Sequence, residues 1–176
     1  MGLLDDSRLD HDFLQAHGFD RARFEAEAEA VAAGRLKAED SVLRGIIEPD
    51  PAVTTVRADD TEARDLGRRA LENGEVAVVV LNGGMATRFG GVVKGVVEVA
   101  DGKSFIGLKL EDALRAGRRF GKAVPFVSMN SFATAEATHR HLHDHDGFGA
   151  QPDDLLSFEQ TIAVRLTEGG ELFVVD

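Results

Sequence analysis

The residues best suited to chemistry lie in a glycine-rich segment, Leu81 to Gly95, with the sequence LNGGMATRFGGVVKG. Paired glycines let backbone N–H groups approach an anion closely, because no side chain stands in the way. Arg88 and Lys94 add positive charge to the same segment. These residue types predict a loop that holds a polyphosphate. A surface turn that merely contains glycines is the alternative.

Two familiar phosphate-binding loops do not fit this spacing. The Walker A loop needs glycine directly before its lysine and Ser or Thr after it, whereas Val93 precedes Lys94 and Gly95 follows. The dinucleotide pattern G-x-G-x-x-G also fails, since its second glycine, counted from Gly83, would fall on Met85. The segment is therefore neither a Walker A loop nor a dinucleotide fingerprint.

A run of alternating histidines, from His139 to His145, is a second candidate for chemistry. On a helix, His139 and His143 form one i, i+4 pair, His141 and His145 form another, and either pair could hold zinc. The two pairs lie about 200° apart at ~100° per residue, so they cannot form one four-ligand site. We expect a solvated helix end here and assign no metal ligand.

The elements that must position the glycine-rich loop alternate between strands and helices. Six consecutive apolar residues, Val76 to Leu81, predict a fully buried parallel strand that ends at the loop. A helix over Phe105 to Phe120, stopped by Gly121, and a second buried strand over Ala123 to Met129 should follow. Further expected elements are a helix from Thr134 to about His145 and strands at Leu155 to Phe158 and Leu172 to Val175. This order predicts an α/β fold, in which ligands bind at the carboxyl edge of the sheet.

Residues 1–74 predict a helical region that precedes the α/β part, residues 75–176. Asp20 is expected to cap a helix from Arg21 to Ala33, which Gly34 stops. Thr61 is expected to cap a second helix that ends at Asn73 and Gly74. The expected role of this region is packing.

The composition is that of a globular chain. Its 176 residues are 43% hydrophobic and 29% charged, which is enough to bury one sizeable core. The net charge of −11 argues against binding to nucleic-acid backbones. The absence of cysteine excludes disulfides, thiolate zinc sites and a cysteine nucleophile. Without a signal-peptide pattern or a stretch near the ~18 apolar residues of a membrane span, the expected location is cytoplasmic.

Three segments in order resemble the UTP–glucose-1-phosphate uridylyltransferase family. The first is the glycine-rich loop with Lys94, where Val93 replaces the proline that the family usually has. The second, Met129 to Thr134, is similar to the family segment Met-Asn-Ser-Phe-x-Thr, with Thr138 at its later threonine. The third, Phe158 to Gln160, is similar to the Phe-x-Gln segment. The resemblance implies a Rossmann-like, GT-A-like nucleotidyltransferase fold, incomplete in this chain, with a helical N-terminal region.

The reaction that the resemblance implies is uridylyl transfer. An oxygen of glucose 1-phosphate attacks the α-phosphorus of UTP, giving UDP-glucose and pyrophosphate. Arg88 and Lys94 are the implied catalytic residues, which would neutralise the developing charge together with Mg²⁺. Asn130 and Ser131 are further candidates, for which capping of the following helix is the alternative role. The implied UTP-binding residues are Leu81, Asn82, Gly83, Gly84, Thr87, Lys94 and Gln160, of which Gln160 would pair with the uracil edge.

We expect this chain to be an N-terminal portion of such an enzyme, carrying the UTP-binding half of the site. In the family, the sugar-nucleotide loop, a metal-holding aspartate and a later lysine follow the Phe-x-Gln segment, so the chain alone is expected to bind UTP weakly or to be inactive. The alternatives are a UDP-N-acetylhexosamine pyrophosphorylase, a non-catalytic nucleotide-binding module and a helical interaction protein built on residues 1–74. The sequence leaves the sugar 1-phosphate and the oligomeric state open.

Overall fold

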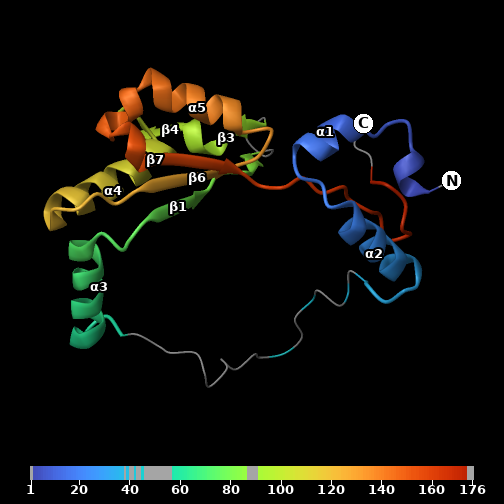
Figure 1. Cartoon of the computed structure of the whole chain (residues 1–176), viewed down its shortest axis with the longest axis horizontal. Helices are drawn as coiled ribbons and strands as arrows, with labels where there is room; N and C mark the ends of the chain where they lie inside the picture. Colours follow the sequence, from blue (N-terminus) through green and yellow to red (C-terminus); the bar gives the residue numbers. More distant parts are fainter. Residues whose placement is uncertain are drawn as a thin grey trace. The chain divides into compact units, whose positions relative to one another are not determined.

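The computed structural model describes residues 2–37, 39, 42, 45, 57–86 and 91–173. The chain divides into two compact units, which are drawn in Figure 1. We call Thr55–Gln160 the sheet unit, and Met1–Thr54 with Thr161–Asp176 the helical unit. The predicted division after Gly74 lies elsewhere, because helix α3 (Thr61–Asn73) groups with the sheet and the last residues group with the N-terminal helices.

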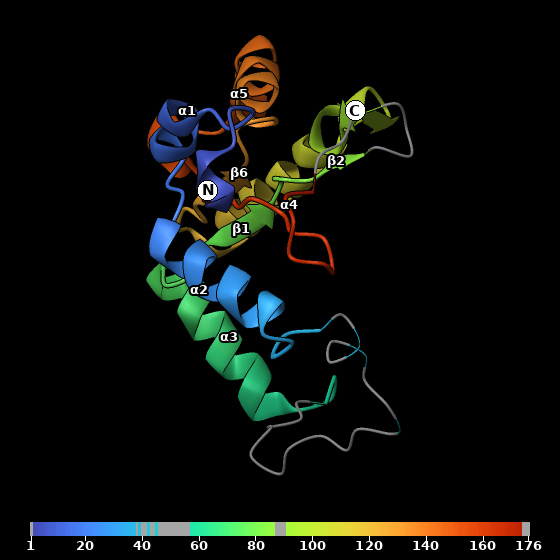
Figure 2. The ribbon, with the colours of Figure 1, turned by 90° about the vertical axis from the view of Figure 1, so that its right-hand side faces the viewer.

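The sheet unit is built on a three-stranded parallel sheet in the order β1-β6-β7. Figures 1 and 2 both show β1 beside β6. The register aligns Leu81, Met129 and Phe158 across the three strands, so all three end at the same edge. The prediction of a parallel sheet is confirmed, with strand bounds that differ slightly from the predicted ones: β1 (Val78–Leu81), β6 (Phe126–Asn130) and β7 (Leu155–Glu159).

Helix α4 (Phe105–Phe120) covers one face of this sheet, as its apolar spacing predicts. Ile106 and Leu110 are almost completely buried and pack with Phe126 of β6. The Ser104 hydroxyl caps the helix by accepting a hydrogen bond from the Gly107 N–H. Gly121 ends the helix in the left-handed conformation (φ 71°), which glycine adopts without steric cost. The predicted helix is therefore confirmed at both ends.

The other face of the sheet is exposed, which corrects the prediction of a fully buried first strand. Val78 and Val80 face the core with Phe126, but Val79 and Leu81 point the other way and are 55% and 75% exposed. Leu156 and Phe158 of β7 are also exposed. An apolar run predicts burial on both faces only where elements cover both faces, and in this unit the described core lies on one side.

Helix α3 belongs to the sheet unit because Leu71, near its end, packs against the same core. The Asp60 carboxylate caps the helix by accepting a hydrogen bond from the Ala63 N–H at 3.0 Å. The prediction of Thr61 as the cap is wrong by one residue, since Thr61 is already helical. Gly74 ends the helix with φ 74°, as predicted.

Short elements surround the sheet and carry the loops at its edge. Two small antiparallel pairs join β2 with β3 and β4 with β5. Helix α5 (Ala135–Asp144) follows β6, close to its predicted bounds. The remaining elements among the described residues of the sheet unit are β2 (Met85–Ala86), β3 (Val92–Val93), η4 (Lys94–Val96), β4 (Glu98–Ala100), β5 (Lys103–Ser104), η5 (Asp146–Gly149) and η6 (Pro152–Asp154).

The described part of the helical unit contains three short helices and the C-terminal segment that returns beside them (Figure 1). Asp20 caps α2, as predicted, through a hydrogen bond from the Arg23 N–H. Of the predicted strand Leu172 to Val175, Leu172 forms a single bridge with Leu166, and residues 174–176 lie outside the described part. The helices are η1 (Leu3–Asp5), α1 (His11–Ala16) and α2 (Arg21–Ala32). None of the helices described in the chain has the length and apolar content needed to cross a lipid bilayer.

Candidate nucleotide site

The predicted site segments meet at the carboxyl edge of the parallel sheet, where β1, β6 and β7 end. The Asn82 N–H, just after β1, donates to the Met129 carbonyl at 2.8 Å. The Gln160 N–H, just after β7, donates to the Asn130 carbonyl, also at 2.8 Å. Main-chain hydrogen bonds therefore fix the starts of all three loops relative to one another. This is the edge at which open α/β sheets bind ligands.

Gly83 and Gln160 lie in direct contact, although they are 77 positions apart in the sequence. A Cβ placed on Gly83 would lie 2.6 Å from Oε1 of Gln160, so any side chain at position 83 would have to displace the glutamine amide. None of the residues that the structure describes lies within 4 Å of a Cβ placed on the neighbouring Gly84. The Gln160 amide is thus seated on the bare backbone of Gly83, while Gly84 faces open space. Gly83, Gly84 and Gln160 therefore lie together at this edge of the sheet.

Lys94 begins the short turn η4, close to the start of α4. Its ammonium group lies 5.5 Å from the centroid of the Phe105 ring, within the range of a cation–π interaction. Lys94 itself is exposed, so its charge is available to an anion. Phe105 is a residue that sequence reasoning missed, and a Phe at the start of a predicted helix carries no signal for such a contact.

Asn82 and Asn130, both candidate ligands, are buried and bonded to each other. The Asn82 side-chain amide donates to Oδ1 of Asn130 at 2.9 Å and to Oγ1 of Thr138 at 2.8 Å. Ser131 is also buried, and its N–H donates to Oγ1 of Thr134. The bonds of Asn82 to Asn130 and Thr138 therefore connect the loop after β1 to β6 and α5 in the protein interior. Thr138 matches a family position but had no role in the sequence analysis, because its partner lies on another element.

Two predicted site residues lie outside the part of the chain that the structure describes. These are Thr87 and Arg88, in the span between β2 and β3. Their roles in UTP binding and catalysis stay predictions. Leu81 ends β1 beside the loop, and its side chain is exposed on the uncovered face of the sheet.

The histidines of α5 differ in solvent exposure, whereas the sequence predicts a helix end in which all of them are solvated. His141 is half-buried: its Nε2 lies 2.7 Å from the Ser104 hydroxyl, and its ring contacts those of His145 and Phe148 in tilted arrangements. Burial lowers the pKa of His141 below its ordinary value of 6.5, and the nearby His145 lowers it further. His139 contacts the Ser157 hydroxyl instead. Across the described ranges, no three His, Asp or Glu side chains converge in a way that could hold a metal ion.

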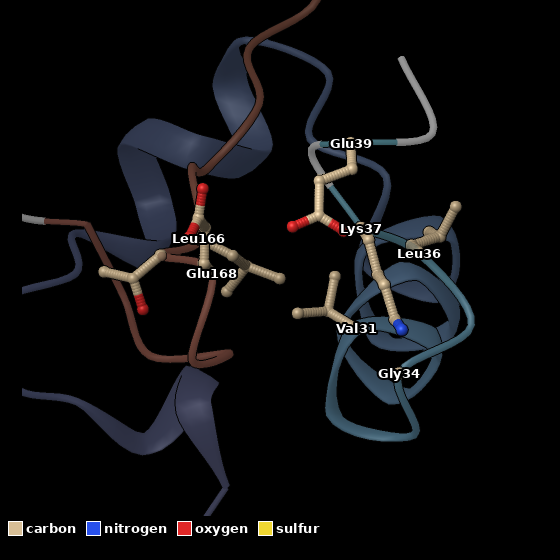
Figure 3. Close-up of a pocket in the computed structure, with 8 residues that line it drawn as sticks. Val31, Gly34, Leu36, Lys37, Glu39, Leu166 and Glu168 are labelled. Carbon is tan, nitrogen blue, oxygen red and sulfur yellow. The ribbon is translucent and has the colours of Figure 1, made fainter. Parts of the chain in front are cut away.

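The helical unit also contains a hollow, which is a second place where a ligand could bind. It lies between the end of α2 and the C-terminal segment, with Val31 on one side and Leu166 on the other (Figure 3). Lys37 contributes one positive charge, but Glu39 and Glu168 line the same hollow. Acidic groups next to a single lysine do not favour a phosphate. The sheet edge is therefore the stronger candidate site.

Comparison with known proteins supports the family suggested by the sequence. A family model described as UTP–glucose-1-phosphate uridylyltransferase matches residues 24–175. A Schizosaccharomyces pombe protein named "Probable UTP--glucose-1-phosphate uridylyltransferase" is 40% identical over 102 residues, covering 57% of this chain and 19% of that protein. UDP-N-acetylglucosamine diphosphorylase 1 of Arabidopsis thaliana is 29% identical over 147 residues, covering 73% of this chain and 29% of that protein.

Solved structures share the fold. The uridine diphosphate N-acetylglucosamine pyrophosphorylase of Trypanosoma brucei, solved in complex with an inhibitor, aligns with a TM-score of 0.59 at 22% identity. The alignment covers 87% of this chain and 32% of that one. This chain thus spans only a minor part of the length of the proteins that it matches. Because the family match extends over most of its residues, the chain belongs to the UTP–glucose-1-phosphate uridylyltransferase family.

Proposed function

We propose that this chain binds UTP at the carboxyl edge of its sheet and supplies the UTP-binding half of a site for uridylyl transfer to glucose 1-phosphate. The products of that reaction are UDP-glucose and pyrophosphate. The observation that carries the proposal is the contact between Gly83 and Gln160, which joins the glycine-rich loop to the glutamine. Family membership supports the same reading.

Each exposed group at this edge is assigned a role in binding the base or the phosphates of UTP. The Gln160 amide offers one acceptor and two donors, which can pair with the edge of uracil. The backbone of Gly83 and Gly84 lets the nucleotide approach closely, since Gly84 faces open space. The Lys94 ammonium would neutralise charge on the phosphates as the α-phosphorus is attacked. Arg88 and Thr87 belong to the same proposal through the family resemblance.

The fold supports this assignment at a coarser level. A parallel sheet with its loops at the carboxyl edge is consistent with a Rossmann-like, GT-A-like nucleotidyltransferase domain, which we infer to be the fold of the sheet unit. Mg²⁺ is part of the proposal as the ion that accompanies the triphosphate. The described residues offer no cluster of ligands to hold it, so we derive no step through it.

Two alternatives concern the identity of the sugar phosphate and whether this chain catalyses the reaction or only binds the nucleotide. UDP-N-acetylglucosamine diphosphorylases of Arabidopsis thaliana are among the relatives, so N-acetylglucosamine 1-phosphate is the second candidate acceptor. Asn82 and the Met129–Asn130 pair favour glucose 1-phosphate by resemblance, and competition between the two sugar phosphates in a longer protein would separate them. UTP binding without pyrophosphate release would favour a non-catalytic nucleotide-binding module.

The role of Lys94 is tested by calorimetric titration of UTP into the chain. We expect Lys94→Ala to weaken binding at least about tenfold, equivalent to ~1.4 kcal/mol, because a charge that contacts phosphate is lost. Lys109→Ala is the matched control, since Lys109 is an exposed lysine on α4 of the same unit. Equal UTP affinity for the wild type and Lys94→Ala would remove Lys94 from the site.

A further inference from the structure

We propose that Asn130 and Thr138 are positioning residues of the nucleotide site, which act by fixing the side chain of Asn82 beneath the glycine-rich loop. The inference rests on the proposed function, because it explains how the loop and the Lys94 turn are held ready for UTP. It assigns a role to Thr138 and replaces direct substrate contact by Asn130 with an internal role.

The network has a definite direction of hydrogen bonding. Both N–H bonds of the Asn82 amide are used, one toward Oδ1 of Asn130 and one toward Oγ1 of Thr138. The Thr138 hydroxyl in turn donates to the Thr134 carbonyl at 2.7 Å, so it must accept from Asn82. The Asn130 amide donates to the Ser128 hydroxyl at 3.3 Å. These donors and acceptors leave Asn82 a single orientation.

The network links three separate elements to the loop. Asn82 follows β1, Asn130 ends β6 and Thr138 lies on α5, so the bonds join residues 48 and 56 positions apart. The remaining atom of the amide, Oδ1 of Asn82, lies against the backbone of Gly95, where a Cβ would overlap it. Gly95 directly follows Lys94. The same amide therefore fixes the start of the glycine-rich loop and the turn that presents Lys94.

Burial separates this role from direct ligand binding. Asn130 and Thr138 have no exposed surface, and Asn82 is 7% exposed. A nucleotide at the surface can reach Gly84, Gln160 or Lys94, but not a side chain that is fully enclosed. Loss of one member leaves a buried N–H without a partner, which costs more than an ordinary hydrogen bond contributes. The amide then rotates or takes up water, and the loop loses its fixed position.

The test compares three threonine variants of the full 176-residue chain by UTP titration. Thr138→Val removes the acceptor for Asn82, and we expect UTP affinity to fall about tenfold. Thr138→Ser keeps the hydroxyl and should restore affinity to within about twofold. Thr134→Val is the control, because Thr134 is equally buried but its hydroxyl bonds to Ser131 rather than to Asn82.

A nucleotide-free measurement accompanies the titration. Amide hydrogen exchange at Gly83, Gly84 and Gly95 should accelerate in Thr138→Val and return toward the wild-type rate in Thr138→Ser. Equal UTP affinity in Thr138→Val and the wild type overturns the positioning role. The same holds if Thr134→Val loses as much affinity as Thr138→Val. Failure of the folded wild-type chain to bind UTP refutes the proposed function instead, and the nucleotide-positioning role with it.

Discussion

At the scale of single residues, two adjacent glycines have different surroundings and so different tasks. Gly83 is pressed against the Gln160 amide, whereas Gly84 faces open space. The far end of a flexible glutamine can move, so a side chain at position 83 displaces that amide rather than unfolding the loop. A side chain at position 84 meets no atom of the described residues and would obstruct a ligand that approaches the backbone.

Alanine at each glycine separates these tasks. We expect Gly83→Ala to weaken UTP binding and to reduce discrimination against other nucleotides, because the displaced Gln160 no longer reads the base. Gly84→Ala should weaken all nucleotides by a similar factor, on the order of tenfold, and leave thermal unfolding unchanged. Titration with UTP and ATP and a thermal melt of each variant provide the comparison. Unaltered nucleotide binding in both variants would contradict the site.

Some of these residue roles could be predicted from the sequence, and others could not. The family resemblance implies that Gly83 and Gln160 serve one site, and the strands predicted before them are consistent with a shared sheet edge. The role of Thr138 could not be predicted, since it depends on a single hydrogen bond to a residue 56 positions away. Burial of Asn130 and exposure of Leu81 depend equally on which elements cover each face of the sheet.

At the scale of elements, α5 is anchored to the start of α4 through His141. The His141 ring contacts the Ser104 hydroxyl that caps α4, and it lies 4.2 Å from the ring of His145 and 5.7 Å from that of Phe148, centroid to centroid. The bounds of α4 and its glycine stop could be predicted from sequence. The inward packing of one histidine could not, because all four occur in a polar run.

The lowered pKa of His141 predicts a pH-dependent stability. Burial and His145 disfavour the protonated ring in the folded state, while Asp144 opposes them. The unfolded chain, with an ordinary histidine pKa of 6.5, therefore binds more protons near pH 6. The contribution of His141 to stability is present above that pKa and is lost as the pH falls through and below it.

Thermal unfolding at pH 7.5 and 5.5 tests this linkage. The melting temperature of His141→Gln should fall less between the two pH values than that of the wild type. His143→Gln serves as the control, since the His143 side chain is 89% exposed. If His141→Gln shows the full wild-type decrease, another group causes the acid sensitivity.

At the scale of the whole molecule, every described site residue belongs to the sheet unit. Lys94, Gln160 and the Asn82 network all lie within Thr55–Gln160, while the helical unit contributes none of them. The sheet unit also has its own buried core around Ile106, Leu110 and Phe126. The nucleotide site should therefore depend on this unit alone.

A shortened chain tests that independence. Residues 57–160 retain the Asp60 cap of α3 and the complete described core, so we expect this chain to fold and to bind UTP within about threefold of the 176-residue chain. Circular dichroism establishes folding before titration. A folded shortened chain that loses UTP binding, beside a full chain that retains it, would place part of the site in the helical unit.

The central claim is that the carboxyl edge of the sheet selects a uridine nucleotide. The most direct measurement is calorimetric titration of UTP into the 176-residue chain with Mg²⁺, with ATP and NAD as competitors of different base and shape. We predict saturable UTP binding at least about tenfold tighter than that of ATP, because Gln160 pairs with uracil beside the glycine-rich loop. Equal affinity for UTP and ATP, or no UTP binding by a folded chain, would contradict the account.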